Sequence, residues 1–254
     1  MTCGGWKYAA ASVVGTAHQK FPDGECQDAH ALDYVQRLSA FVGVVSDGAG
    51  SASQAQRGSR LACDFVLERV AETSPALVFS RALADKTLDG LRGTLRSLAS
   101  NDGFQIRDFA CTLLVAIICP DQSVFWQMGD GAMCFRQQGE DRFKYAFWPE
   151  KGDYANVTYF VTDENAKDHL DFDITDGEIV ELGMFSDGLE RLALDFAAGE
   201  AHSGFFKGLF PHMHSLPAGR CDDLSLQIAN FLASERVNRR TDDDKTLILA
   251  SRIP

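Results

Sequence analysis

Short apolar runs that end at glycine or aspartate turns dominate the pattern of this chain. Residues 41–45 (Phe-Val-Gly-Val-Val) have no polar side chain and are followed within two residues by Asp47-Gly48. A run of four to eight apolar residues bounded by a turn is typical of a strand buried on both faces. The same kind of pattern predicts strands over residues 7–16, 29–34, 41–45, 111–118, 123–127, 132–136, 143–147, 179–185 and 245–251.

Other segments carry their apolar residues at helical spacing. The two clearest predicted helices are residues 54–72 and 82–98. The first carries Leu61, Phe65, Val66 and Val70 at this spacing, and the second carries Leu88, Leu91, Leu95 and Leu98. Residues 189–198 and 224–234 predict two later helices. Residues 154–175 are polar, acidic and poorly periodic, so we interpret them as a surface flap or insert. Runs of strands that alternate with pairs of helices favour an α+β fold.

Composition narrows the classes of protein to which the chain could belong. A length of 254 residues with 45% apolar residues and no linker-like tract favours a single domain, residues 1–254. The net charge of −12 argues against nucleic acid or a membrane surface as a partner. The longest apolar run, residues 111–119, is too short to span a bilayer. Seven cysteines without paired spacing, and an N-terminus unlike a secretory signal, predict a reduced, cytoplasmic protein.

Acidic residues recur in tight turns next to the predicted strands. Five segments share this feature: Cys26-Gln27-Asp28, Ser46-Asp47-Gly48-Ala49-Gly50-Ser51, Gly129-Asp130-Gly131, Ser186-Asp187-Gly188 and Asp242-Asp243-Asp244. Each alone is compatible with an ordinary turn or a solvated loop. Together, on the strands of one sheet layer, they would crowd carboxylates at one edge, where only hard cations relieve the repulsion. The sequence therefore predicts a metal site whose ligands are dispersed along the chain.

The ordered set of motifs resembles the metal-dependent protein phosphatases of type 2C, in particular their compact bacterial branch. The resemblance covers nearly the whole chain. It rests on Gly15-x-x-His18 with Cys26-Gln27-Asp28, Val45-Ser46-Asp47-Gly48-Ala49-Gly50-Ser51 with Gly58-Ser59, Ala110-Cys111-Thr112-Leu113, Gly129-Asp130-Gly131, Ser186-Asp187-Gly188-Leu189 and Asp243-Asp244-Lys245-Thr246. It implies a four-layer α-β-β-α sandwich, in which two antiparallel sheets are flanked by helix pairs.

The resemblance also implies the ligands of a centre with two Mn²⁺ or Mg²⁺ ions and a third, weaker ion. Asp47 would bridge the two main ions, and the carbonyl of Gly48 would bind one of them. The remaining metal-binding positions implied are Asp28, Asp130, Asp187 and Asp243, of which Asp130 and Asp187 match the third site. The implied reaction is hydrolysis of phosphoserine or phosphothreonine in proteins by attack of a metal-bridged hydroxide, for which oxygen ligands and two cations are suited.

Three positions depart from the pattern of many relatives. Gln27 stands where many have Glu, and Ala49 stands where eukaryotic members have a His that protonates the leaving alcohol. The phosphate-binding Arg has no counterpart before Asp28. His18 is the nearest candidate for that phosphate contact and is counted with Asp47 and Asp187 as catalytic. A structural role for His18, with Lys20 as the phosphate contact, stays open.

Two other functions are compatible with the residues. Gln27 and Ala49 would suit a pseudophosphatase that binds phosphoproteins or another partner with little turnover, whereas the retained aspartates argue for activity. A binding module with structural calcium sites is the third possibility, although the chain has no EF-hand loop. For an active enzyme we expect a phosphorylated protein as substrate, a Ser/Thr kinase or its targets as partners, and a monomeric state.

Overall fold

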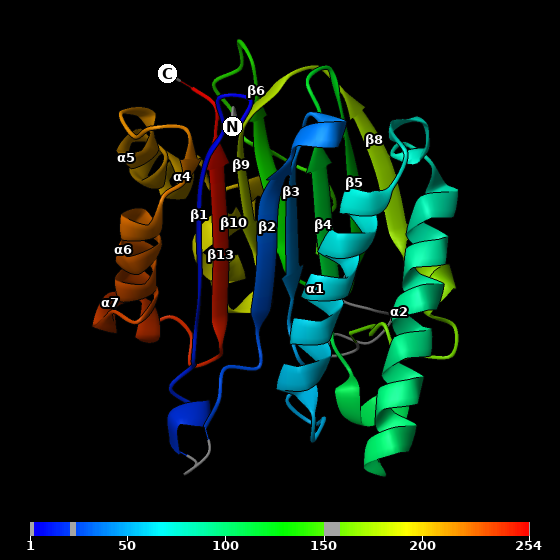
Figure 1. The fold of residues 1–254 in the computed structure, drawn as a ribbon. Helices are drawn as coiled ribbons and strands as arrows, with labels where there is room; N and C mark the ends of the chain where they lie inside the picture. Colours follow the sequence, from blue (N-terminus) through cyan, green and yellow to red (C-terminus); the bar gives the residue numbers. More distant parts are fainter. Residues whose placement is uncertain (1–2, 21–23, 150–157, 254) are drawn as a thin grey trace.

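The computed structural model describes residues 3–20, 24–149 and 158–253, which form two stacked sheets between two layers of helices (Figure 1). The first sheet has the strand order β12-β1-β13-β9-β6-β7. Its strands are β1 (Lys7–Val13), β6 (Ala132–Gln137), β7 (Lys144–Tyr145), β9 (Ile179–Phe185), β12 (Gly219–Arg220) and β13 (Lys245–Ser251). All neighbours pair antiparallel except β1 and β12.

The second sheet has the order β2-β3-β4-β5-β8 and is antiparallel throughout. Its strands are β2 (Ala29–Val35), β3 (Ala40–Ser46), β4 (Leu113–Ile118), β5 (Gln122–Met128) and β8 (Asp171–Asp176). A separate two-stranded hairpin joins β10 (Leu194–Asp195) to β11 (Glu200–Ala201).

Helices cover the outer face of each sheet (Figure 1). The long helices α1 (Ala55–Glu72) and α2 (Arg81–Asp102) pack on the second sheet. The first sheet is covered by a set of shorter helices: α3 (Glu190–Ala193), α4 (Ser203–Leu209), α5 (Pro211–His214), α6 (Asp222–Leu232) and α7 (Glu235–Asn238). The four-layer α-β-β-α sandwich expected from the sequence is thus confirmed. None of the helices in the described residues combines the length and apolar composition needed to cross a membrane.

Burial on both faces explains why the central strands are continuously apolar. In β3, Phe41 and Val45 face the other sheet, whereas Val42 and Val44 pack against the α1–α2 layer. The space between the sheets is filled by large side chains, among them Trp6, Tyr8, Phe125, Met133, Met184 and Ile248. A rigid three-layered core of this kind fixes the strand ends, and therefore the turns that follow them.

Three segments differ from the sequence-based expectation. The helix expected over residues 189–198 ends at Ala193, because Leu194–Asp195 pairs with Glu200–Ala201 instead. The strand expected over 143–147 has only two paired residues, Lys144–Tyr145. The expected flap, 154–175, includes most of β8, a strand at the edge of the second sheet, while its residues 154–157 lie outside the described residues.

Candidate metal centre

The acidic turns lie together at one end of the sandwich, the lower end in Figure 1. Asp47 follows β3, Asp130 follows β5 and Asp187 follows β9. Asp28 and Asp243 instead precede β2 and β13, whose first residues pair with the ends of β3 and β1. Since neighbouring strands are antiparallel, the end of one strand lies beside the start of the next. This pairing gathers carboxylates within each sheet, and the stacking of the two sheets brings Asp47 and Asp130 to Asp187.

Asp47, Asp130 and Asp187 form the tightest group. Each offers a carboxylate oxygen, and these oxygens all lie within 4.8 Å of one another. All three side chains are partly exposed, toward a cavity of about 330 Å³ that they share with Gly48, Thr112 and Asp243. Such a spacing and a set of oxygen-only ligands suit Mg²⁺ or Mn²⁺.

The crowding perturbs the acidity of the group. Burial, followed by the charges of Asp130 and Asp243, raises the pKa of Asp187 to about 8. Burial and the charges of Asp28 and Asp187 raise the pKa of Asp47 well above its usual range. A cation among these oxygens would offset both effects, because it favours the ionised form of each. The metal-free protein therefore holds protons that bound cations would displace.

Asp28 lies behind this group, fully inside the sandwich. Its Oδ2 accepts a hydrogen bond of 2.6 Å from Ser186 Oγ, and Ser186 Oγ accepts one of 3.0 Å from Thr246 N. Burial raises the pKa of Asp28 to about 6, although the bond from Ser186 opposes the shift. Among the described residues, Asp28 Oδ1 and Asp187 Oδ1 are buried oxygens without a hydrogen-bond partner. Oxygens left in this state fit ligands of a cation.

The three adjacent aspartates before β13 have separate roles. Asp244 is buried, and its two oxygens accept hydrogen bonds of 2.6 Å from Gly15 N and from Gln27 N. Asp242 and Asp243 are exposed and line the cavity. The buried ammonium of Lys245 donates to the Asp243 carbonyl at 3.1 Å. The main chain of Asp242 is held as well, since its carbonyl accepts from Ala17 N at 2.8 Å. Asp243 is the better candidate ligand, because its charge is the one that acts on Asp187.

His18, selected from the sequence as a phosphate contact, also lines the cavity. Its Nδ1 lies 3.0 Å from Asp244 Oδ1, and the side chain is 23% exposed. His18 thus has a buried carboxylate on one side and the cavity on the other. This position is compatible with a structural role and with a contact to the substrate. The side chain of Lys20, the alternative phosphate contact, lies outside the described residues.

Gly48 and the glycines around Asp130 are required by local geometry. A Cβ at Gly48 would lie 2.8 Å from the Gln27 carbonyl oxygen and 2.9 Å from the Ala55 main chain. Gly129 and Gly131 have φ values of 86° and 85°, which side chains other than glycine rarely adopt. The chain can therefore turn sharply on both sides of Asp130 and point its carboxylate at Asp187.

Several residues that support the site were not given a role from the sequence. Thr112 Oγ1 accepts a hydrogen bond from Asp47 N at 2.9 Å. Thr158 Oγ1 donates to Asp130 Oδ2 at 2.9 Å, and buried Glu190 accepts from Gly131 N at 3.0 Å. A Ser, Thr or Glu of this kind leaves no signal in a single sequence, because only the fold brings it to the turn.

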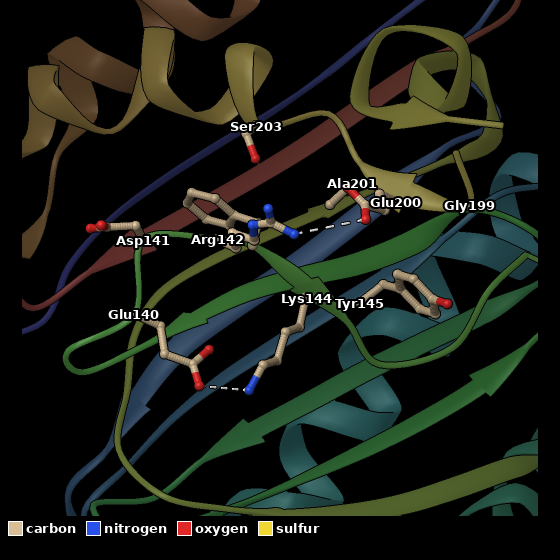
Figure 2. A pocket seen from close by; sticks show the side chains of 10 residues that line it. Glu140, Asp141, Arg142, Lys144, Tyr145, Gly199, Glu200, Ala201 and Ser203 are labelled. Atoms are coloured by element: carbon tan, nitrogen blue, oxygen red, sulfur yellow. Dashed lines mark hydrogen bonds and ion pairs between the residues drawn. The ribbon is translucent and has the colours of Figure 1, made fainter. Parts of the chain in front are cut away.

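A second, larger cavity of about 860 Å³ lies between β7 and β11 (Figure 2). Figure 2 shows acidic and basic side chains along it, and two pairs of them compensate each other: Lys144 with Glu140 at 2.8 Å, and Arg142 with Glu200 at 4.0 Å. In the described residues the group of carboxylates with metal-binding spacing lies at the smaller cavity. The smaller cavity is thus the better candidate for chemistry.

Comparisons with known sequences give one family model and a relative that spans nearly the whole chain. Residues 14–233 match the family model described as Protein phosphatase 2C. Serine/threonine-protein phosphatase 3 of Escherichia coli (strain K12) is 35% identical over 253 residues, covering 96% of this chain and 98% of the relative.

Solved structures share the fold at lower identity. Serine/threonine phosphatase Stp1 from Staphylococcus aureus has a TM-score of 0.66 at 15% identity, covering 96% of this chain and 94% of that one. The catalytic domain of the serine/threonine protein phosphatase PstP, in complex with two manganese ions, has a TM-score of 0.64 at 12% identity, covering 97% of both chains.

Proposed function

The chain belongs to the protein phosphatase 2C family, and from this premise we propose that it hydrolyses phosphoserine and phosphothreonine in proteins with a centre of two Mn²⁺ or Mg²⁺ ions at Asp47. It is a metal-dependent phosphoprotein phosphatase. The observation that carries the assignment of the site is the group of three carboxylates, whose oxygens lie within 4.8 Å of one another at a solvent-facing cavity.

The proposed ligand set is the one that the family resemblance implies, and the places of Asp47, Gly48, Asp130, Asp187 and Asp243 around the cavity support it. The charges of Asp28, Asp130 and Asp187 all act on Asp47, which would bridge the two ions, with the Gly48 carbonyl beside it. Asp187 and Asp243 would complete the set from the other sheet, and Asp28 would support it from behind. Asp130, together with Asp187, would hold a third ion.

Bound in this way, the ions would lower the pKa of an attacking water and neutralise charge on the phosphoryl oxygens. The protein's own groups supply the rest. The carboxylates would hold the ions, and Thr112 Oγ1 accepts the hydrogen bond that holds the Asp47 main chain. His18, backed by Asp244 at 3.0 Å, would donate to a phosphoryl oxygen from the rim. Ala49 has no proton to give, so we assign protonation of the leaving alcohol to water in the open cavity.

Assays with and without metal test this proposal. We expect phosphate release from a phosphoserine peptide in Mn²⁺, abolition by EDTA and recovery with excess Mn²⁺. Asp47→Asn should lower turnover by orders of magnitude while the protein still unfolds cooperatively. Metal binding without phosphate release from any phosphopeptide would overturn the enzymatic proposal in favour of a pseudophosphatase. Stabilisation by Ca²⁺ alone would favour a calcium-binding module.

The surroundings of the enzyme are also proposals. Seven free thiols, five of them buried, support a reducing compartment such as the cytoplasm. The net charge of −12 supports protein substrates rather than nucleic acid or membrane surfaces. We further propose a monomer that opposes a Ser/Thr kinase. Size-exclusion chromatography and comparison of phosphoproteins in cells with and without the enzyme test these points.

A further inference from the structure

One wall of the catalytic cavity is a loop that comes from outside the acidic turns. The 158–163 loop contributes Thr158 and Phe160 to the cavity lining. Thr158 also donates the hydrogen bond to Asp130 described above. The loop leads into β8 at the sheet edge. Its middle is held by the sandwich, because Val161 is buried in the core and its N donates to Cys111 O, two residues before β4. Further contacts hold the rest of the loop.

Those contacts converge on Arg92, a residue of helix α2. Arg92 Nη1 donates to the Val161 carbonyl at 2.6 Å and also to the Asp163 carbonyl. Two further hydrogen bonds hold the loop. Val161 N donates to Cys111 O of the sandwich at 2.9 Å, and within the loop Phe160 N donates to Asp163 Oδ2 at 2.9 Å. Arg92 thus ties the loop to helix α2.

The burial of Arg92 makes this role specific. Its side chain is 6% exposed and lies on the face of α2 that carries Leu88, Leu91 and Leu95. A guanidinium in an apolar layer is costly unless its donors find acceptors, and here two main-chain carbonyls of the loop accept from Nη1. An apolar residue would fill the same space with less cost. The exception therefore indicates that the position of the loop, rather than core packing, requires an arginine.

We propose that Arg92 is a positioning residue that fixes the 158–163 loop as the wall against which residues next to a substrate's phosphorylated side chain bind. The inference rests on the proposed function, since it presumes a phosphorylated protein at this cavity. It predicts that Arg92 affects the binding of a peptide more than the reaction of the phosphoryl group, because a small aryl phosphate has no flanking residues to bind against the loop.

The test compares Arg92→Met and Arg92→Lys with the matched control Arg96→Met. Arg96 lies one turn further along α2 and is exposed. Hydrogen exchange measured by mass spectrometry reports on the loop independently of activity. Steady-state kinetics at saturating Mn²⁺, with a phosphoserine peptide and with para-nitrophenyl phosphate, separates KM from kcat.

We expect amides of the 158–163 loop to exchange about tenfold faster in Arg92→Met, as for a lost charged hydrogen bond. The KM for the peptide should rise about tenfold, with kcat and the KM for the aryl phosphate within about twofold of wild type. Arg92→Lys should be intermediate, and Arg96→Met should match wild type. Phe160→Ala, which removes the aromatic side chain of the wall and leaves Arg92 in place, should also raise the peptide KM. In the double variant with Arg92→Lys, the effect on the peptide KM should be smaller than the sum of the two single effects on a free-energy scale.

Unchanged exchange in the loop of both Arg92 variants would overturn the inference. So would faster exchange with an unchanged peptide KM, or an equal loss of kcat on both substrates. If Arg92→Met does not fold, Arg92→Lys and Phe160→Ala decide the matter by the same criteria. A wild-type protein inert toward both substrates would overturn the proposed function and the substrate role of Arg92 together, while the exchange data would still show whether Arg92 holds the loop.

Discussion

Removing one carboxylate of the metal centre should stabilise the metal-free protein. The substitution is Asp47→Asn, which keeps the size of the side chain and removes its charge. Two unit charges 4.8 Å apart, the upper limit for this group, repel by about 3.5 kcal/mol at an effective dielectric constant of about 20. Asp47 has two such neighbours, Asp130 and Asp187.

Protonation limits how much of this repulsion the protein bears. The pKa of Asp187 rises from 3.8 to about 8, so keeping that carboxyl ionised costs at most about 6 kcal/mol at high pH. The cavity is open to water, which screens the charges further. We therefore expect Asp47→Asn to raise the free energy of unfolding of the metal-free protein by about 2 kcal/mol at pH 8.

The pH dependence has a defined sign. Because the pKa values of Asp28, Asp47 and Asp187 are raised in the folded state, their contribution to stability is complete below pH 4 and is lost as pH rises toward about 8. The metal-free wild type should thus lose stability over this range from these groups. The advantage of Asp47→Asn should be less than half as large at pH 5 as at pH 8.

Urea denaturation in EDTA, followed by the fluorescence of buried Trp6 and Trp126, measures the effect. The matched control is Asp64→Asn, an exposed position on α1, which should change stability by less than about 0.5 kcal/mol. In Mn²⁺ the order should reverse, since the wild type binds the ions more tightly. A variant that is less stable than wild type in EDTA at pH 8 would refute the account of carboxylate repulsion.

Three further predictions concern residues around the centre. Gly48→Ala should lower Mn²⁺-dependent turnover more than tenfold, because its Cβ meets main-chain atoms at 2.8–2.9 Å, whereas Gly50→Ala, with open space, should leave turnover unchanged. Glu190→Leu removes the acceptor for Gly131 N and should lower the free energy of unfolding, measured by denaturation, by about 1–3 kcal/mol. Glu190→Gln should be closer to wild type. Burial lowers the pKa of His30 to about 4, so the stability it contributes is lost as pH falls from about 6.5 to 4. In that window the wild type should lose about 1–2 kcal/mol more than His30→Gln, measured by denaturation at each pH, and parallel pH profiles would contradict this.

The central strands could be predicted from the sequence because each is buried on both faces. Val42, Val44, Leu113 and Val115 pack under the helices, and their neighbours pack between the sheets, so the whole run must be apolar. Strand β8 escaped prediction because it lies at a sheet edge, where Asp171, Asp173 and Ile174 are exposed. At this edge the side chains meet solvent rather than a core, so the strand has no run of apolar residues that would predict it.

The candidate ligands could be named from the sequence, but their separate roles could not. Asp243 and Asp244 are chemically identical neighbours, yet one lines the cavity and the other is buried against Gly15 and Gln27. Which of them faces inward depends on the register of β13 with β1, a long-range property. Thr158 and Arg92 were missed for the same reason, since only the fold brings them to Asp130 and to the loop.

Anomalous diffraction from crystals grown in Mn²⁺ tests the central assignment most directly. The account predicts two strong manganese peaks in the cavity, both within bonding distance of Asp47 and between them contacting Asp187 and Asp243. Asp47→Asn crystals should lose at least one of these peaks. Manganese bound only away from this cavity, or two full peaks retained in Asp47→Asn, would contradict it.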